Sequence, residues 1–243
     1  MVKTTQRSSF FLIAVCLFFA TGIANASDRS DEDKARDMHR KPTEVLEFLG
    51  LRAGDTVVDV WAAGGWYTEV LSNAVGDEGH VYSQNAPSVL QFREGVYDRT
   101  LTARLADGRL GNVERIDVVL AESRIEDNSV DFAITALNFH DVYNRNGAEA
   151  AVELMASVYA VLKPGGVFGV IDHAGNADTD NSDIHRIDPE LAKAAATEAG
   201  FIVESESDLL SHPDDDHTKM VFDPTIRGKT DRFILRLRKP GQE

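Results

Sequence analysis

A buried β-strand that passes through a small-residue turn into a helix constrains this chain more than any other feature of its sequence. Residues 56–60 form a nearly continuous β-branched run, which is typical of a strand covered on both faces of a parallel sheet. Residues 61–65 include two alanines and two glycines, and residues 66–75 have the apolar spacing of a helix. This sequence of elements predicts an α/β fold.

Strand and helix patterns alternate along the rest of the chain. Further strands are predicted at residues 79–83, 116–120, 130–136 and 167–171. Helices are predicted at residues 42–50, 89–105, 148–162 and 188–200. The last two strands, 201–204 and 231–237, have no helix between them and should pair antiparallel. Together the patterns predict a single three-layer α/β domain.

The first 26 residues have the parts of a secretory signal peptide. Lys3 and Arg7 give a basic start, residues 10–23 are apolar and uncharged, and residues 24–26 have the small-x-small form of a cleavage site. The apolar run is shorter than the roughly 20 residues that span a bilayer. We therefore expect residues 1–26 to be removed, leaving no stable membrane anchor, and the protein to be periplasmic or secreted. Residues 27–243 would form the domain, with residues 27–50 as an N-terminal helical cover.

Charge and cysteine content narrow the partners further. The chain has 40 acidic and 25 basic residues and a formal net charge of −15, so it would repel a polyanion. We therefore expect no nucleic-acid partner. The single cysteine, Cys16, lies within the predicted signal peptide, and the domain that remains would have no disulfide.

Two segments carry a resemblance to a known family. Residues 58–65 read Val-Asp-Val-Trp-Ala-Ala-Gly-Gly after the first strand, and residues 161–166 read Val-Leu-Lys-Pro-Gly-Gly before the fifth. From about residue 42 to residue 240 the chain resembles the class I S-adenosylmethionine-dependent methyltransferases. Three segments are more narrowly similar to a bacterial group of exported predicted methyltransferases: residues 64–71, 185–189 and 230–240.

The resemblance implies a Rossmann-like fold and a methyltransferase activity. The sheet should have seven strands in the order 3-2-1-4-5-7-6, with strand 7 antiparallel. S-adenosylmethionine would bind at the carboxyl ends of strands 1, 2, 4 and 5, where the switch-point rule for open α/β sheets also places a ligand. The acceptor would be a small molecule.

The family's cofactor motif is only partly present. An acidic residue followed by three alternating glycines is expected; Asp59 and Gly65 match, but Trp61 and Ala63 replace the first two glycines. The resemblance also implies contacts to the ribose at the end of strand 2 and to the adenine after strand 3. The residues assigned to the cofactor are Asp59, Trp61, Ala63, Gly64, Gly65, Gln84, Asn85, Glu122 and Asn138. Trp61 would either bound the ligand or fill its pocket.

Two pairs of histidine and aspartate follow neighbouring strands. His140 and Asp141 come after residues 130–136, and Asp172 and His173 come after residues 167–171. The carboxyl ends of parallel strands meet at one edge, so we expect the pairs to converge. A histidine near a carboxylate is suited to general-base catalysis. We predict that these four residues are catalytic. The predicted substrate contacts are Tyr143, His185 and Arg186.

Two alternatives to methyl transfer remain open. A methyltransferase fold that has lost its cofactor would be a metal-dependent enzyme for hydrolysis or oxidation, or else a binding protein. The metal ligands would then be His140, Asp141, Asp172, His173 and His185. Such ligands suit zinc, iron or manganese, although the sequence has no linear metal-binding motif. In the binding protein, an apolar pocket would be lined by Trp61, Trp66 and Tyr67.

Overall fold

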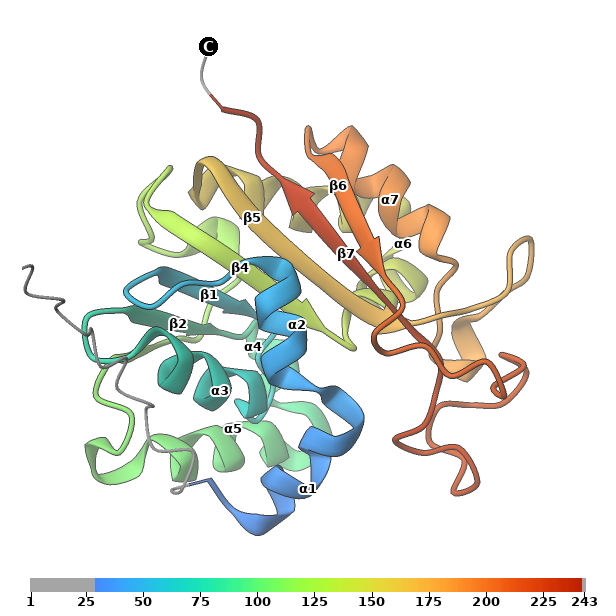
Figure 1. The fold of residues 1–243 in the computed structure, drawn as a ribbon, viewed down its shortest axis with the longest axis horizontal. Helices are drawn as coiled ribbons and strands as arrows, with labels where there is room; N and C mark the ends of the chain where they lie inside the picture. The colour runs from blue at the N-terminus through green and yellow to red at the C-terminus, as the bar shows by residue number, and fades with distance from the viewer. Residues whose placement is uncertain (1–28, 242–243) are drawn as a thin grey trace, which may run out of the picture.

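A seven-stranded sheet with helices on both faces forms the protein (Figure 1). The structure, a computed structural model, describes residues 29–241, and the predicted signal peptide lies outside them. The strand order is β3-β2-β1-β4-β5-β7-β6. Strands β1 to β5 pair in parallel, and β7 is antiparallel to both of its neighbours. The predicted order and the antiparallel last strand are therefore confirmed.

The bounds of the elements agree with the predicted alternation in most places. The strands are β1 Thr56–Val60, β2 His80–Gln84, β3 Val113–Ile116, β4 Val130–Ala136, β5 Leu162–His173, β6 Ile202–Ser207 and β7 Arg232–Arg238. The helices are α1 Asp31–Arg40, α2 Pro42–Leu49, α3 Trp66–Val75, α4 Pro87–Leu90, α5 Phe92–Leu105, α6 Phe139–Val161 and α7 Pro189–Glu198.

The sheet separates two hydrophobic layers. Val57 and Val58 are both fully buried because successive side chains of a strand point to opposite faces. Val57 packs in the layer that includes α2 and α3, and Val58 packs in the layer that includes α6 and α7. This burial on both sides explains the continuous apolar run of β1.

Three predicted boundaries were wrong, and one of them is the start of β5, which lies at Leu162 although the strand was predicted at residues 167–171. The third strand is Val113–Ile116 instead of residues 116–120, because it pairs with β2 and β2 ends beside Ile116. Helix α6 begins at Phe139, although the sequence predicted a start near residue 148. Gly147, with a φ of +87°, interrupts the helix, which hid its first two turns from the periodicity of the sequence.

The N-terminal helices lie against the start of α3 (Figure 1). The indole nitrogen of Trp66 donates to the backbone oxygen of Asp33 in α1, at 3.2 Å. The guanidinium groups of Arg29 and Arg40 lie 4.9 and 4.4 Å from the Trp66 ring, as cation–π contacts. Among the described residues, no helix is both long enough and apolar enough to cross a membrane.

Candidate active site

The turn between β1 and α3 has an unusual backbone. Trp61, Ala63 and Gly65 have φ values of +56°, +51° and +78°. This left-handed conformation costs a residue other than glycine about 1–2 kcal/mol. The turn therefore keeps the glycine-like conformation at three alternating positions, although only the last of them is a glycine. A strained conformation persists only where the surrounding structure imposes it.

Side chains from the end of β2 impose that conformation. The Trp61 N–H donates to Gln84 Oε1 at 3.2 Å, and the Ala63 N–H donates to Asn85 Oδ1 at 2.8 Å. The amide nitrogens of Gln84 and Asn85 donate in turn to the backbone oxygens of Val118 and Ala63. Both side chains are fully buried. They hold the turn in this geometry, and their predicted contact with a ribose stays a prediction.

Two further residues assigned to the cofactor support the same turn. The buried carboxylate of Asp59 accepts a hydrogen bond from Thr68 Oγ1 in α3, at 2.6 Å. Burial raises the pKa of Asp59 to about 7, against the opposing effect of the Thr68 hydrogen bonds. The amide nitrogen of Asn138 donates to the Trp61 oxygen at 2.8 Å and to the Ala136 oxygen at 2.9 Å. Asn138 thereby ties the end of β4 to the turn.

The two predicted pairs of histidine and aspartate meet at the carboxyl edge of the sheet. The ring nitrogen Nδ1 of His140 lies 2.7 Å from Asp172 Oδ1. The other carboxylate oxygen, Asp172 Oδ2, accepts a hydrogen bond from the backbone N–H of His140, also at 2.7 Å. Asp172 also accepts a hydrogen bond from the backbone N–H of His173. Burial lowers the pKa of His140, but the charge and hydrogen bond of Asp172 outweigh it, and the pKa is raised. His140 is therefore oriented by a buried carboxylate, as a general base requires.

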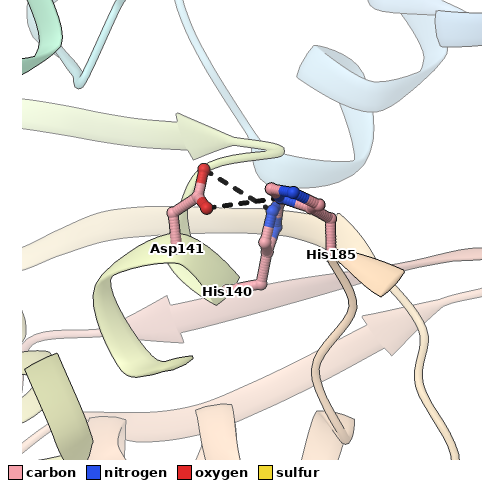
Figure 2. A group of neighbouring side chains, drawn as sticks. All are labelled: His140, Asp141 and His185. Atoms are coloured by element: carbon pink, nitrogen blue, oxygen red, sulfur yellow. Dashed lines mark ion pairs between the residues drawn. The ribbon is translucent and has the colours of Figure 1, made fainter. Parts of the chain in front are cut away.

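A second carboxylate and a third imidazole lie beside His140 (Figure 2). Asp141 Oδ2 is 3.6 Å from His140 Nε2, and Asp141 Oδ1 is 3.4 Å from His185 Nδ1. His140 and Asp141 begin α6, whereas His185 comes from the loop before α7. The His140 side chain is buried, while those of Asp141 and His185 are 27% and 26% exposed. The cluster is thus open to solvent on one side.

The remaining predicted catalytic and substrate residues lie around this cluster. The His173 ring contacts Thr230 Oγ1 at 2.8 Å, and burial holds its pKa well below the usual range, so the ring is neutral. Arg186 is fully buried and forms two hydrogen bonds with the carboxylate of Asp215. Tyr143, in the first part of α6, is half-buried and packs against the hydrophobic layer between the sheet and helices α6 and α7. The substrate contacts proposed for these side chains stay predictions.

An apolar surface lies beside the turn and was not predicted from the sequence. Val118 and Val119 are exposed just beyond β3, although residues 116–120 were predicted to be a strand. The backbone oxygen of Val118 accepts from Gln84, so this segment lies next to the end of β2. Glu122, the predicted adenine contact, is exposed in the 3-10 turn Leu120–Glu122 that follows. In the sequence, this surface is indicated only by the two adjacent valines at the end of the predicted strand.

Comparison with known proteins shows similarity to methyltransferases. The ubiquinone/menaquinone biosynthesis C-methyltransferase of Marinomonas sp. is 26% identical over 186 residues, which are 74% of this chain and 68% of that enzyme. The demethylmenaquinone methyltransferase of Listeria monocytogenes is 25% identical over 151 residues, which are 62% of this chain and 58% of the Listeria enzyme. No family model matches the chain.

A solved structure has the same fold. An S-adenosylmethionine-dependent methyltransferase from Aquifex aeolicus superimposes with a TM-score of 0.61, at 20% identity, over 87% of this chain and all of that one. The parallel strands, the left-handed turn after β1 and the polar carboxyl edge define a Rossmann-like α/β protein. The strand order, with its antiparallel β7, and the sequence similarity place the chain in the class I S-adenosylmethionine-dependent methyltransferase superfamily. Its narrower similarity to an exported bacterial group stays a prediction.

Proposed function

We propose that this chain transfers the methyl group of S-adenosylmethionine to a small-molecule acceptor. The observation that carries the proposal is the turn at residues 61–65. It keeps three left-handed positions without the first two glycines, and side chains at the end of β2 and just after β4 hold it there. Stored strain of this kind is concentrated at ligand-binding and catalytic sites. The methyltransferases similar in sequence support the same reaction class.

The residues present fit the cofactor at this turn. When bound, S-adenosylmethionine supplies an activated methyl group on its sulfonium. The 61–65 backbone would hold it, with the half-buried Trp61 beside it, and the exposed Val118 and Val119 offer an apolar surface suited to a purine. The end of β2 reads Gln84-Asn85 and offers the ribose no carboxylate. We therefore expect binding to depend on the turn and its aromatic neighbour.

His140 would act on the acceptor as general base. Its Nδ1 is held by the buried Asp172, so that Nε2 is the nitrogen available to take a proton. The Asp172 carboxylate would stabilise the imidazolium that results. General-base catalysis contributes about 10²–10⁴-fold to a rate, and alignment of the acceptor with the methyl group would supply most of the remainder.

Replacing Trp61 tests whether the turn still binds the cofactor. We expect Trp61→Ala to weaken binding of S-adenosylhomocysteine by about tenfold, because stacking of an aromatic ring contributes roughly 0.5–1.5 kcal/mol. Calorimetric titration measures the affinity, and circular dichroism checks folding. Ala63→Gly is the matched control, since it removes a methyl group at another left-handed position of the turn and leaves the indole in place.

The opposite result would identify a fold that has lost its cofactor. If the indole fills the pocket, folded wild-type protein will not bind S-adenosylhomocysteine, and Trp61→Gly will create binding by opening that space. This pair of outcomes would contradict the proposed activity and favour the metal-dependent or binding-protein alternative.

We also propose that the protein is exported. The proposal rests on the basic start, the short apolar run and the cleavage site within residues 1–26. Protein purified from its native host should have the mass of residues 27–243, which intact mass spectrometry measures. A cytoplasmic product that retains Met1 would contradict the proposal.

A further inference from the structure

We propose that His140, Asp141 and His185 bind a divalent transition-metal ion at the carboxyl edge of the sheet. The three ligand atoms come from the start of α6 and from the loop before α7, and they lie within 4.8 Å of one another. Figure 2 shows the side chains turned toward a common point. The site goes beyond the proposed methyl transfer and does not rest on it. A metal ion on His140 Nε2 would occupy the lone pair that the general-base role requires, so the two roles exclude each other in one molecule.

The buried nitrogen of His140 is the main observation. His140 Nε2 has no hydrogen-bond partner among the described residues, and the side chain is 4% exposed. Its Nδ1 faces the Asp172 carboxylate, which only accepts, so Nδ1 carries a proton and a neutral ring presents a lone pair at Nε2. The Asp141 carboxylate, whose Oδ2 lies 3.6 Å from Nε2, is an acceptor as well. A buried acceptor facing another acceptor is unfavourable unless a cation lies between them.

The distances between the ligand atoms suit a metal ion. Bonds from zinc to nitrogen or oxygen are about 2.0–2.2 Å long, which places neighbouring ligand atoms of a tetrahedral site about 3.3–3.6 Å apart. The separations of Asp141 from His140 and from His185 are 3.6 and 3.4 Å. These two distances involve different oxygens of Asp141, Oδ2 toward His140 and Oδ1 toward His185. A carboxylate that binds through one oxygen must therefore turn, and the three ligand atoms, which lie within 4.8 Å of one another, must draw closer. His185 lies at the end of a short 3-10 turn and is a quarter exposed, so its ring has room to move.

Asp172 supports the proposed metal ligand His140 from the other side of its ring, at Nδ1. Metal-binding histidines usually donate their second N–H to a carboxylate, which fixes the tautomer and the ring orientation. Asp172 holds His140 in this way at 2.7 Å. Two imidazoles and one carboxylate leave coordination positions open for water or for an oxygen of a ligand. These positions would lie on the solvent side of the cluster, where Asp141 and His185 are partly exposed.

Two cations compete with a metal for this site. Arg145 contacts Asp141 Oδ1 at 3.2 Å, but its side chain is largely exposed and can swing away. A proton on Nε2 is the second competitor, and the raised pKa of His140 favours it. A measurement of metal binding at neutral pH distinguishes these occupants.

Titration of chelator-treated protein with Zn²⁺ alone tests the proposal. We expect calorimetry to give one Zn²⁺ per chain, and Co²⁺ to give the visible absorption bands of a site with nitrogen ligands. His185→Ala should weaken Zn²⁺ binding by at least about 100-fold, and Asp172→Asn by about 10–100-fold. Arg145→Gln should strengthen binding several-fold, because it removes the competing cation.

His80→Ala is the matched control. His80 also lies beside a carboxylate, at 3.5 Å from Glu114, but this surface pair does not belong to a group of three ligands found among residues 29–241. Its replacement should leave the affinity unchanged. Zn²⁺ binding that is undiminished in folded His185→Ala and Asp141→Asn, or absent from folded wild type, would overturn the proposal. The titration contains no S-adenosylmethionine, so its outcome is independent of the test of methyl transfer.

Discussion

Asp215→Asn should lower the free energy of unfolding by about 3–5 kcal/mol. The Asp215 carboxylate accepts two hydrogen bonds from the fully buried Arg186, at 2.9 and 2.8 Å, and its own side chain is 2% exposed. Removing one partner of a buried ion pair leaves an uncompensated charge in the interior. Asp215 also accepts the N–H of Asp231 at 2.7 Å, so the loss spreads to the start of β7. Chemical denaturation measures the change.

The neighbouring aspartate provides the control. Asp214 is exposed, and Asp214→Asn should change the free energy of unfolding by less than about 0.5 kcal/mol. Equal effects at the two positions would show that net charge matters here and that the buried pair does not. The expected difference would show that the Arg186–Asp215 pair fastens two segments together. These are the loop that contains His185 and the long connection that precedes β7.

Asp59→Asn should change how the stability of the protein depends on pH. The folded-state pKa of Asp59 is raised to about 7 by burial, against 3.8 for the free side chain. Between these values the folded state binds more protons than the unfolded state, so stability falls as pH rises from about 4 to about 7. Above pH 7 the full cost, a few kcal/mol, is present. Asparagine keeps an acceptor for Thr68 without this charge.

The test compares wild type and variant by urea unfolding between pH 4.5 and 8. The variant should gain stability relative to wild type as pH rises, and the difference should level off above pH 7. Other groups act in the opposite sense: the lowered pKa of the buried His173 makes stability fall as pH drops below about 6.5. That contribution is common to both proteins and cancels in the difference. Asp77→Asn, at an exposed carboxylate, should show no such trend.

The fold could be predicted from the sequence because burial on both faces leaves a strong pattern. The β-branched run of β1 identified a central strand, and the lack of a helix between the last two strands identified their antiparallel pairing. The third strand was misplaced because its end depends on the length of β2, which the apolar run from residue 116 onward does not reveal. Local sequence patterns thus predicted which helices and strands form better than they predicted the residues at which those elements begin and end.

The site was predictable only in part. The switch-point rule correctly brought His140 and Asp172 to one edge of the sheet, since His140 follows β4 and Asp172 lies at the end of β5. The position of His185 depends on a loop, whose course no periodicity encodes. The bonds of Gln84 and Asn85 to the turn were also hidden, because a polar side chain at a strand end is equally compatible with solvent, a ligand or the backbone.

Because Gln84 and Asn85 hold the backbone of the 61–65 turn, the shape of the turn does not depend on which residues occupy positions 61 and 63. In a turn shaped by glycines, the positions nearest the ligand have no side chains to offer. Here the conformation is specified by β2, so positions 61 and 63 are available to carry side chains that discriminate between ligands. A search for glycines would overlook such a site, whereas a search for backbone conformation would find it. The same division of labour would allow selectivity to be redesigned at Trp61 without rebuilding the turn.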